Sequence, residues 1–289
     1  MSSKILERKI IELDDRRKKM ISSGWGKEAI ENVTVEKIFY DSDGLRVSGY
    51  IAYPNDFSKK FPSIIWCRGG LGELGVIDEF NAQGILGTIA AWGYAVFATQ
   101  YRGNDGGEGN DEFGGGDLND VLNLIPLAKG IPNADENNWG IEGWSRGGMM
   151  TYLALMKTGI FKAAVSIGGV ADLRCDKKRS KFVTKLVERN YGKITDEYYR
   201  ELCQSRSVIN KAEKISAETP LMLIHGTSDD RVPVEDSIEL ARRLLKFKSN
   251  IRLVLLENGT HFLKNHKKEI NWLRKNWFDK YLKGENNGA

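Results

Sequence analysis

Short apolar runs recur along the chain, separated by turn residues or by stretches with helical spacing. Two alternating segments, 33–40 and 45–53, flank the turn cluster Asp41-Ser-Asp-Gly44, which predicts an antiparallel hairpin. Six further strand candidates follow, with helical stretches between nearly all of them. This alternation predicts parallel strands joined by crossover helices. The six strands are expected at 63–67, 94–99, 139–144, 163–167, 221–224 and 251–256.

The eight strand candidates suit one continuous, twisted, mostly parallel sheet that opens with an antiparallel hairpin. We therefore expect a single α/β domain over residues 33–285. Residues 1–32 are rich in charge and carry aliphatic residues at roughly helical spacing, which predicts a helical extension, either packed on the domain or used as a lid or partner-binding segment. The widest gap between strands, 170–218, predicts a helical insertion before the seventh strand, because structureless loops of that length are uncommon.

Composition and charge exclude several classes of protein. Of 289 residues, 41% are hydrophobic and 28% charged, as in ordinary globular proteins. The net charge of +4 is spread along the chain without the basic patch that nucleic-acid binding needs, and no apolar run approaches the ~20 residues that span a bilayer. Three widely spaced cysteines and the lack of a secretory signal favour a cytoplasmic location. The sequence gives no indication of oligomeric state.

The segment Gly143-Trp-Ser-Arg-Gly147 matches the G-x-S-x-G pattern of a nucleophile elbow. It lies between the strand predicted at 139–144 and a helical pattern at 149–157, which is the context that the motif requires. A serine in this turn has its hydroxyl pushed out at the carboxyl edge of the sheet. Ser145 is therefore the candidate nucleophile, and the N–H of Arg146, at the helix N-terminus, is the candidate oxyanion donor.

A serine nucleophile needs a base, and the chain contains three histidines. His261 follows the last predicted strand directly, so its loop should carry it over the strand ends. His225 ends an apolar run and is expected to pack there, bonded to its own loop. His266 stands among lysines at the start of a helix, where a solvated position is expected. His261 is therefore the candidate base.

The imidazole must be oriented by a carboxylate, and the loop after the strand at 221–224 offers Asp229 and Asp230. Only one of two adjacent carboxylates can face the histidine; the other is expected to cap the following helix or to pair with Arg231. Either choice gives the chain order of nucleophile, acid and base that α/β-hydrolases share. No metal-binding spacing or cofactor motif accompanies these residues, so we expect no cofactor.

Three segments resemble the catalytic domain of the prolyl oligopeptidase family of serine peptidases. They are Gly143–Gly148, Leu223–Val232 and Tyr101–Gly103, and the likeness extends over about residues 33–282. The resemblance implies an α/β-hydrolase fold and a hydrolase that cleaves ester or amide bonds through an acyl-enzyme on Ser145. It also implies that Asp229, the first aspartate of its loop, belongs to the catalytic triad. Arg231 matches an arginine that contacts a substrate carbonyl in some members, although a loop salt bridge is an equal alternative.

The sequence departs from the family in two respects. Where members usually place a tyrosine or histidine whose side chain serves the oxyanion, this chain has Arg68-Gly69-Gly70. Backbone groups of Gly69 and Gly70 are then the candidate second donors, and Arg68 a candidate substrate contact. The 289 residues also leave no room for the large β-propeller of well-known members. We therefore expect small ester or short peptide substrates.

Three other functions compete with that of a serine peptidase. A small-substrate carboxylesterase fits the same residues. A hydrolase fold used only for binding would keep the triad but block the site. Gly70–Gly75 spells G-x-G-x-x-G, the fingerprint of dinucleotide-binding oxidoreductases, but the next strand ends without the acidic residue that would hold a ribose. The glycine cluster is therefore given a backbone role.

Overall fold

The computed structural model describes residues 3–173, 185, 188, 192–193 and 197–285. The chain divides into two units, residues 1–141 and 142–289. Its strands form a nine-stranded sheet in the order β1-β2-β3-β5-β4-β6-β7-β8-β9. The predicted mostly parallel sheet with an antiparallel start is confirmed, with one strand more than the eight expected.

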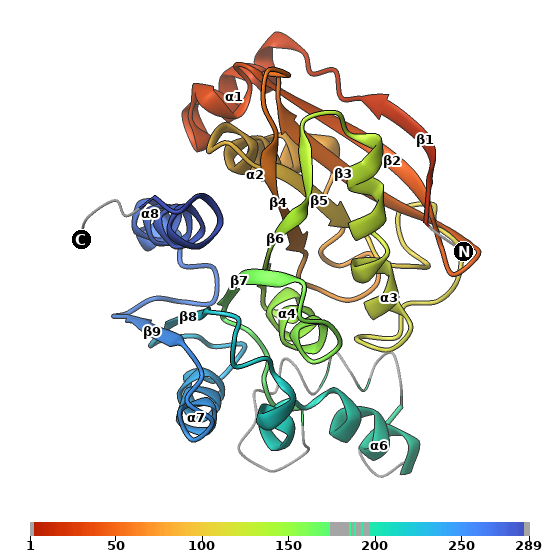
Figure 1. Cartoon of the computed structure of the whole chain (residues 1–289). Helices are drawn as coiled ribbons and strands as arrows, with labels where there is room; N and C mark the ends of the chain where they lie inside the picture. The colour runs from red at the N-terminus through yellow and green to blue at the C-terminus, as the bar shows by residue number, and fades with distance from the viewer. Residues whose placement is uncertain (1–2, 174–184, 186–187, 189–191, 194–196, 286–289) are drawn as a thin grey trace. The chain divides into compact units, whose positions relative to one another are not determined.

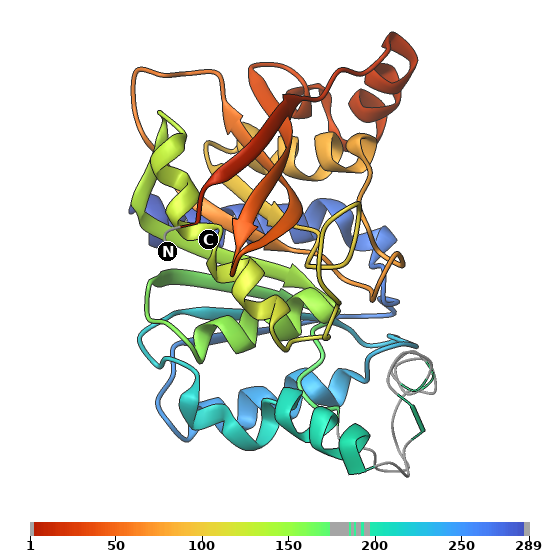
Figure 2. The ribbon, with the colours of Figure 1, turned by 90° about the vertical axis from the view of Figure 1, so that its right-hand side faces the viewer.

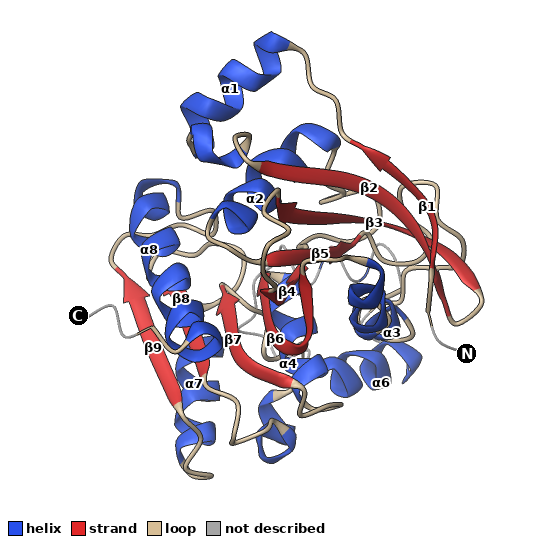
Figure 3. Ribbon diagram, turned by 45° about the horizontal axis from the view of Figure 1, so that its top comes forward, coloured by secondary structure: helices blue, strands red, loops and turns tan. Residues whose placement is uncertain are grey.

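The first unit begins with three antiparallel strands, β1 (Ile5–Ile10), β2 (Val33–Ser42) and β3 (Leu45–Pro54), which lie side by side (Figure 3). β3 also pairs antiparallel with β5, and β5 pairs parallel with β4. The hairpin predicted around Asp41–Gly44 is thus confirmed. The other elements are β4 (Phe61–Cys67), β5 (Ala95–Thr99), β6 (Ala134–Trp144), α1 (Asp15–Trp25), α2 (Glu79–Ala91), α3 (Asp117–Leu122) and the 3-10 helices η1 (Lys27–Ala29) and η2 (Ile125–Gly130).

Strand β1 lies where the sequence pattern predicts a helix, and Figure 2 shows it (red) beside the β2–β3 hairpin (orange). Most of its side chains are exposed, so the two-residue alternation that marks a half-buried strand is missing. Charged pairs join it to its neighbours: Arg8 binds Glu36 of β2, and Glu7 binds Arg46 of β3. The helical prediction holds for α1, whose first turn is capped by Asp14.

The second unit contains three parallel strands, β7 (Phe161–Ile167), β8 (Leu221–Gly226) and β9 (Ile251–Leu256). Helix α4 (Arg146–Leu155) packs on β7, and helices α7 (Val234–Leu245) and α8 (Lys267–Phe278) lie on opposite sides of β8 and β9 (Figure 1). The remaining elements are α6 (Glu197–Arg206), η3 (Ile209–Lys214), η4 (Lys264–His266) and the π-helix η5 (Asp279–Lys283).

The predicted insertion at 170–218 is only partly described. Within it, α6 and η3 are helical, while most of residues 174–196 lie outside the described part of the chain. The boundaries drawn at 32 and 285 and around the insertion stay predictions. No helix among the described residues is long and apolar enough to cross a membrane.

Candidate active site

Ser145 occupies a strained turn between β6 and α4. Its φ of 58° and ψ of −119° lie outside the regions that non-glycine residues favour, and such strain persists only where the surroundings enforce it. The N–H of Ser145 donates to Ile167 O of β7 over 2.9 Å, which holds the turn against the end of that strand. The predicted elbow is therefore present, with α4 beginning at Arg146, the next residue.

The glycines around the serine allow the strand and the helix to approach. A Cβ on Gly143 would lie 2.1 Å from Gly147 O, and one on Gly148 would lie 2.4 Å from Ser166 Oγ. Real Cβ atoms do not come so close to other heavy atoms, so side chains at these positions would force the elbow apart. This explains the spacing of small residues that the sequence shows.

Asp229 lies in the loop after β8, and its side chain is only 1% exposed. Its two oxygens have different partners. Oδ1 accepts the N–H of Arg231 over 2.8 Å and that of Val232 over 2.9 Å. Oδ2 lies 2.8 Å from Nδ1 of His261. Burial alone would raise the pKa of Asp229, but the contacts with His225, His261 and Val232 outweigh it and hold the pKa well below its ordinary value.

His261 is fixed from two directions. Asp229 binds its Nδ1, and the indole Nε1 of Trp144, the residue before the candidate nucleophile, donates to its main-chain oxygen over 3.0 Å. A Cβ on Gly168, just after β7, would lie 3.6 Å from Nδ1 of His261 and 3.3 Å from Oδ2 of Asp229. The strand ends of the second unit thus bring the predicted acid and base together, with Trp144 linking them to the elbow.

The loops that carry Asp229 and His261 are bonded to each other. Ser228 N donates to Gly259 O over 2.9 Å, and Asn258 N donates to Thr227 Oγ1 over 2.9 Å. A Cβ on Gly226 would lie 2.2 Å from Gly259 O, so the backbones touch where both loops begin. This contact fixes the distance between acid and base through main-chain atoms.

No hydrogen bond joins the candidate nucleophile to the candidate base among the described residues. Among the described residues, neither the hydroxyl of Ser145 nor Nε2 of His261 has a hydrogen-bond partner. Since Nδ1 faces a carboxylate, it carries the proton in the neutral imidazole, and Nε2 keeps a lone pair. Hydrogen bonds between nucleophile and base are often long before a substrate binds. The arrangement supplies a hydroxyl, a base and an orienting carboxylate.

Of the two other histidines, His225 has the surroundings that the sequence indicates, whereas the side chain of His266 is only 15% exposed and is thus less solvated than expected. His225 is fully buried and binds Ser237 and the main-chain oxygen of Val232. His266 lies at the start of α8, where it contacts Glu269 and Glu257 O, and the hydrogen bond with Glu269 raises the pKa of this imidazole. No pattern in the sequence predicts one further contact: Nε2 of His225 also lies 3.3 Å from Oδ2 of Asp229.

Arg231 and Phe262 form a pair beside the candidate base. The Arg231 guanidinium lies 4.4 Å from the centre of the Phe262 ring, a cation–π distance. Phe262 follows His261 directly and is 51% exposed. Asp230, the other aspartate of the loop, is exposed, and α7 has no side-chain cap, so the capping role considered for Asp230 is not observed.

Arg68, Gly69 and Gly70 lie in the first unit. Arg68 is fully buried, and its guanidinium donates to Gln100 O, Gly69 O and Gly72 O. Gly70 has a φ of 76°, and a Cβ there would lie 1.8 Å from Leu74 O. The glycines therefore shape a tight turn that Arg68 holds from inside. This supports the backbone role expected for the glycine cluster.

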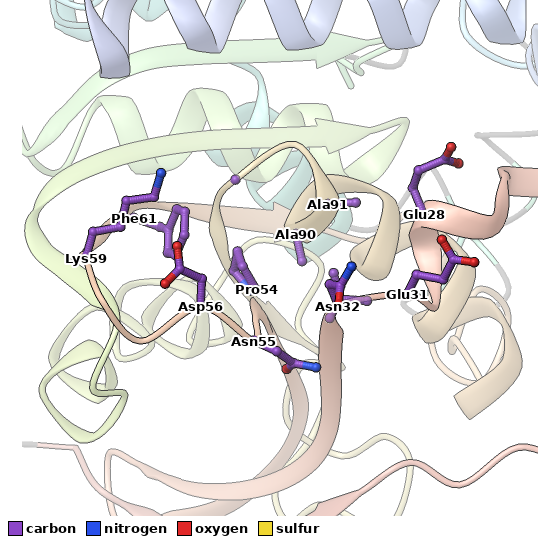
Figure 4. A pocket seen from close by; sticks show the side chains of 12 residues that line it. Glu28, Glu31, Asn32, Pro54, Asn55, Asp56, Lys59, Phe61, Ala90 and Ala91 are labelled. Carbon is purple, nitrogen blue, oxygen red and sulfur yellow. The ribbon is translucent and has the colours of Figure 1, made fainter.

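The first unit also contains a cavity of about 440 Å³ (Figure 4). Its lining includes Glu28, Glu31, Asp56 and Lys59, and none of the candidate site residues. The sequence of the insertion offers four aromatic residues, Phe182, Tyr191, Tyr198 and Tyr199, as candidate walls of a substrate pocket or, equally, as core residues. Of these, Tyr199 is buried in α6, whereas Phe182 and Tyr191 and the side chain of Tyr198 lie outside the described residues. In the described part of the chain, no group of three or more His, Cys, Asp or Glu residues is placed to hold a metal ion.

A comparison with protein families shows to which family the chain is related. The sequence model of the prolyl oligopeptidase family matches residues 81–285. The chain belongs to this family. The resemblance inferred from the motifs is thereby confirmed, and so is the expectation of a hydrolase of the serine peptidase type.

Relatives in the family support the same assignment. The chain is 32% identical over 237 residues to the uncharacterized peptidase YtmA of Bacillus subtilis, covering 80% of this chain and 88% of YtmA. It is 29% identical over 272 residues to the uncharacterized peptidase YuxL of the same organism, covering 86% of this chain and 39% of YuxL.

Solved structures confirm the α/β-hydrolase fold of the family. An acylaminoacyl peptidase of Pyrococcus horikoshii superposes with a TM-score of 0.74 at 22% identity, over 96% of this chain and 46% of that chain. A second, uncomplexed structure of that peptidase gives 0.71 at 25% identity, over 88% and 42%. The chain thus spans less than half of these longer peptidases.

Proposed function

We propose that this chain cleaves amide bonds of short peptides through an acyl-enzyme on Ser145, with His261 as general base and Asp229 as its orienting acid. One observation carries the assignment: the strained Ser145 turn is joined through Trp144 to the main chain of His261, whose ring is bound by the buried Asp229. Family membership supports the reaction class, and the geometry supports the choice of residues.

The reaction has two steps. Oγ of Ser145 attacks the substrate carbonyl carbon while its proton passes to Nε2 of His261, and the imidazolium then gives that proton to the leaving nitrogen as the amide bond breaks. Water repeats the sequence on the acyl-enzyme and releases the acid. We assign the stabilisation of the negative oxygen that develops to the N–H of Arg146 and the positive end of α4, because α4 begins directly after Ser145. Gly69 and Gly70 remain the proposed second donors.

The surface beside the candidate base favours a peptide substrate. The exposed Phe262 ring, backed by Arg231, offers an apolar face and a cation next to His261. A peptide can use both, because its side chains pack on the ring and its carbonyls accept from the guanidinium. An acylaminoacyl peptidase of the same fold, with a TM-score of 0.70, has been solved in complex with Z-Gly-Gly-Phe-chloromethyl ketone. We further propose a cytoplasmic location, on the cysteine usage of the sequence.

Turnover of two substrate classes tests the function. Purified chain is assayed with aminoacyl and prolyl p-nitroanilides and with p-nitrophenyl acyl esters. A peptidase cleaves the anilides with a kcat/KM that responds to the aminoacyl group, whereas cleavage of esters alone would make the chain a carboxylesterase. Ser145→Ala should abolish turnover, and Ser228→Ala, an exposed serine next to Asp229, should leave it unchanged. Equal turnover in wild type and Ser145→Ala would contradict the assignment of the nucleophile.

A further inference from the structure

Asp229 is approached by a second imidazole. His225, the fifth residue of β8, is fully buried four residues before Asp229. Its Nε2 lies 3.0 Å from Val232 O and 3.3 Å from Oδ2 of Asp229, and its Nδ1 lies 2.7 Å from Oγ of Ser237. Both imidazoles therefore reach the same carboxylate oxygen.

The neighbours of His225 fix its tautomer. A carbonyl oxygen can only accept, so Nε2, which faces Val232 O, carries the hydrogen. Nδ1 then accepts from the Ser237 hydroxyl on α7. The polar N–H of a neutral ring is thereby directed at Val232 O and at Asp229 together. Ser237 holds this orientation from a separate helix.

The contact between His225 and Asp229 affects the charge of the carboxylate, because the side chain of Asp229 is almost completely buried. A buried carboxylate resists ionisation unless donors surround it. Oδ1 has two main-chain donors, whereas Oδ2, the oxygen that holds the catalytic imidazole, has only the two ring nitrogens among the contacts of the described residues. How strongly Oδ2 attracts the proton on His261 thus depends on the second ring.

We propose that His225 is a positioning residue that acts through Asp229: its N–H fixes the Oδ2 oxygen and moderates its negative charge, which sets the orientation and basicity of His261. This inference deepens the proposed function and rests on it. The polar partners of His225 among the described residues are Ser237, Val232 and Asp229, so its loss should affect kcat and the pH profile rather than KM. A role in packing alone would change only the amount of folded protein.

Other titratable or charged groups near these contacts include Asp230 and Arg231, which follow Asp229 in its loop, and groups on α4 and α7. Asp236, beside Ser237, accepts the N–H groups of Ala171 and Asp172. Tyr152 of α4 lies close to Ser166 and Ser237, and burial raises the pKa of its hydroxyl, so Tyr152 stays neutral across the range of an activity assay. If substitution of His225 shifts the acidic side of the pH profile of kcat/KM (its acid limb), the shift is then assigned to the Asp229–His261 pair.

The test compares His225→Leu with His225→Gln. Glutamine places an amide N–H near the position of Nε2 and does not titrate, whereas leucine removes the donor. His225→Leu should lower kcat about ten- to a hundredfold, as expected for losing a hydrogen bond to a charged group, with KM within about twofold. The acid limb of its kcat/KM profile should move up by about half a pH unit, because a less stabilised Asp229 binds the imidazolium more strongly. His225→Gln should restore kcat to within about threefold and the limb to its original place.

Two further measurements keep the test decisive if His225→Leu does not fold. Ser237→Ala should move the acid limb in the same direction with a smaller loss of kcat, and ¹⁵N NMR of the wild-type protein should show the Nε2–H tautomer at His225. His266→Gln, at a histidine outside the site, serves as the control and should match the wild type.

The outcomes separate this inference from the proposed function. Rates are normalised to the fraction of chain that a fluorophosphonate labels. If the wild-type protein hydrolyses substrate but His225→Leu or Ser237→Ala keeps its acid limb, or His225→Gln is as impaired as His225→Leu, the positioning role is wrong. If the wild-type protein neither labels nor turns over, the proposed function itself fails.

Discussion

Two buried aspartate side chains, one in each unit, have partners that suit different roles: a structural role for Asp120 and the proposed catalytic role for Asp229. Asp120 of α3 is fully buried, and its oxygens accept from the guanidinium and main-chain N–H of Arg102 and from Ser42. Asp229 is equally buried, but its side-chain partners are imidazoles.

The two aspartates differ in whether the partner side chain can release a proton. A guanidinium keeps its protons at any ordinary pH, so Arg102 and Asp120 form a fixed connection that also includes Asp43. An imidazole exchanges a proton near neutral pH, so the contact of Asp229 with His261 can take part in a reaction. Burial raises the pKa of Asp120 despite its hydrogen bonds with Arg102, whereas the contacts of Asp229 with His225 and His261 outweigh burial and lower its pKa.

The largest effect is expected from Asp229→Asn. An amide cannot hold the proton on Nδ1 of His261 as the carboxylate does, so the imidazole loses its tautomer and kcat should fall by about 10⁴. The folded conformation should change little, because the Oδ1 atom that accepts two main-chain N–H groups is kept, but the melting temperature should fall because the stabilising ionised carboxylate is lost. Steady-state kinetics and thermal unfolding check both parts. Turnover like that of the wild type would show that another residue orients the base.

Breaking the Arg102–Asp120 pair should lower the stability of the fold rather than kcat. Arg102→Met leaves a carboxylate buried without its cation, which costs about 3–5 kcal/mol of unfolding free energy. Urea unfolding measures this loss. Arg102→Met combined with Asp120→Leu is the control, and should regain part of the stability because no buried charge remains. A fall in kcat per folded molecule as large as that of Asp229→Asn would remove the distinction between the two aspartates.

The sequence was sufficient for the residues whose positions follow from topology. Ser145 directly follows β6, whereas Asp229 and His261 lie in the loops after β8 and β9, and parallel strands deliver such loops to one edge of a sheet. Strand β1 was missed because its side chains are mostly exposed and its aliphatic spacing looks helical. The contact of His225 with Asp229 and that of Trp144 with His261 could not be predicted, because they depend on the exact path of the loops, which no residue pattern encodes.

A smaller effect is expected at Trp144, which holds the loop of His261. Trp144→Phe keeps the ring but removes the N–H that binds His261 O, a loss of about 0.5–1.5 kcal/mol. We expect kcat/KM to fall by up to about tenfold, with KM little changed. Trp272→Phe, at an exposed tryptophan of α8, is the matched control. Equal kinetics in both variants would show that this hydrogen bond does not position the base.

The smallest effect is the pH dependence of stability. Because folding lowers the pKa of Asp229, its ionised form stabilises the fold above the unfolded value of about 3.9, and this contribution is lost as the pH falls toward the folded pKa. Between pH 4 and 2.5, the unfolding free energy of the wild type should fall more steeply than that of Asp229→Asn, by up to about 1.4 kcal/mol per pH unit. Parallel slopes in urea unfolding would contradict the lowered pKa.

Covalent labelling tests the central claim most directly. A fluorophosphonate reacts only with a serine that a neighbouring base activates, so the wild-type chain should gain one adduct, which peptide mass spectrometry locates on Ser145. Ser145→Ala should gain none, and Ser228→Ala should label like the wild type. A folded wild-type chain that stays unlabelled, or that carries the adduct on another residue, would contradict the assignment of Ser145, His261 and Asp229 as one catalytic unit.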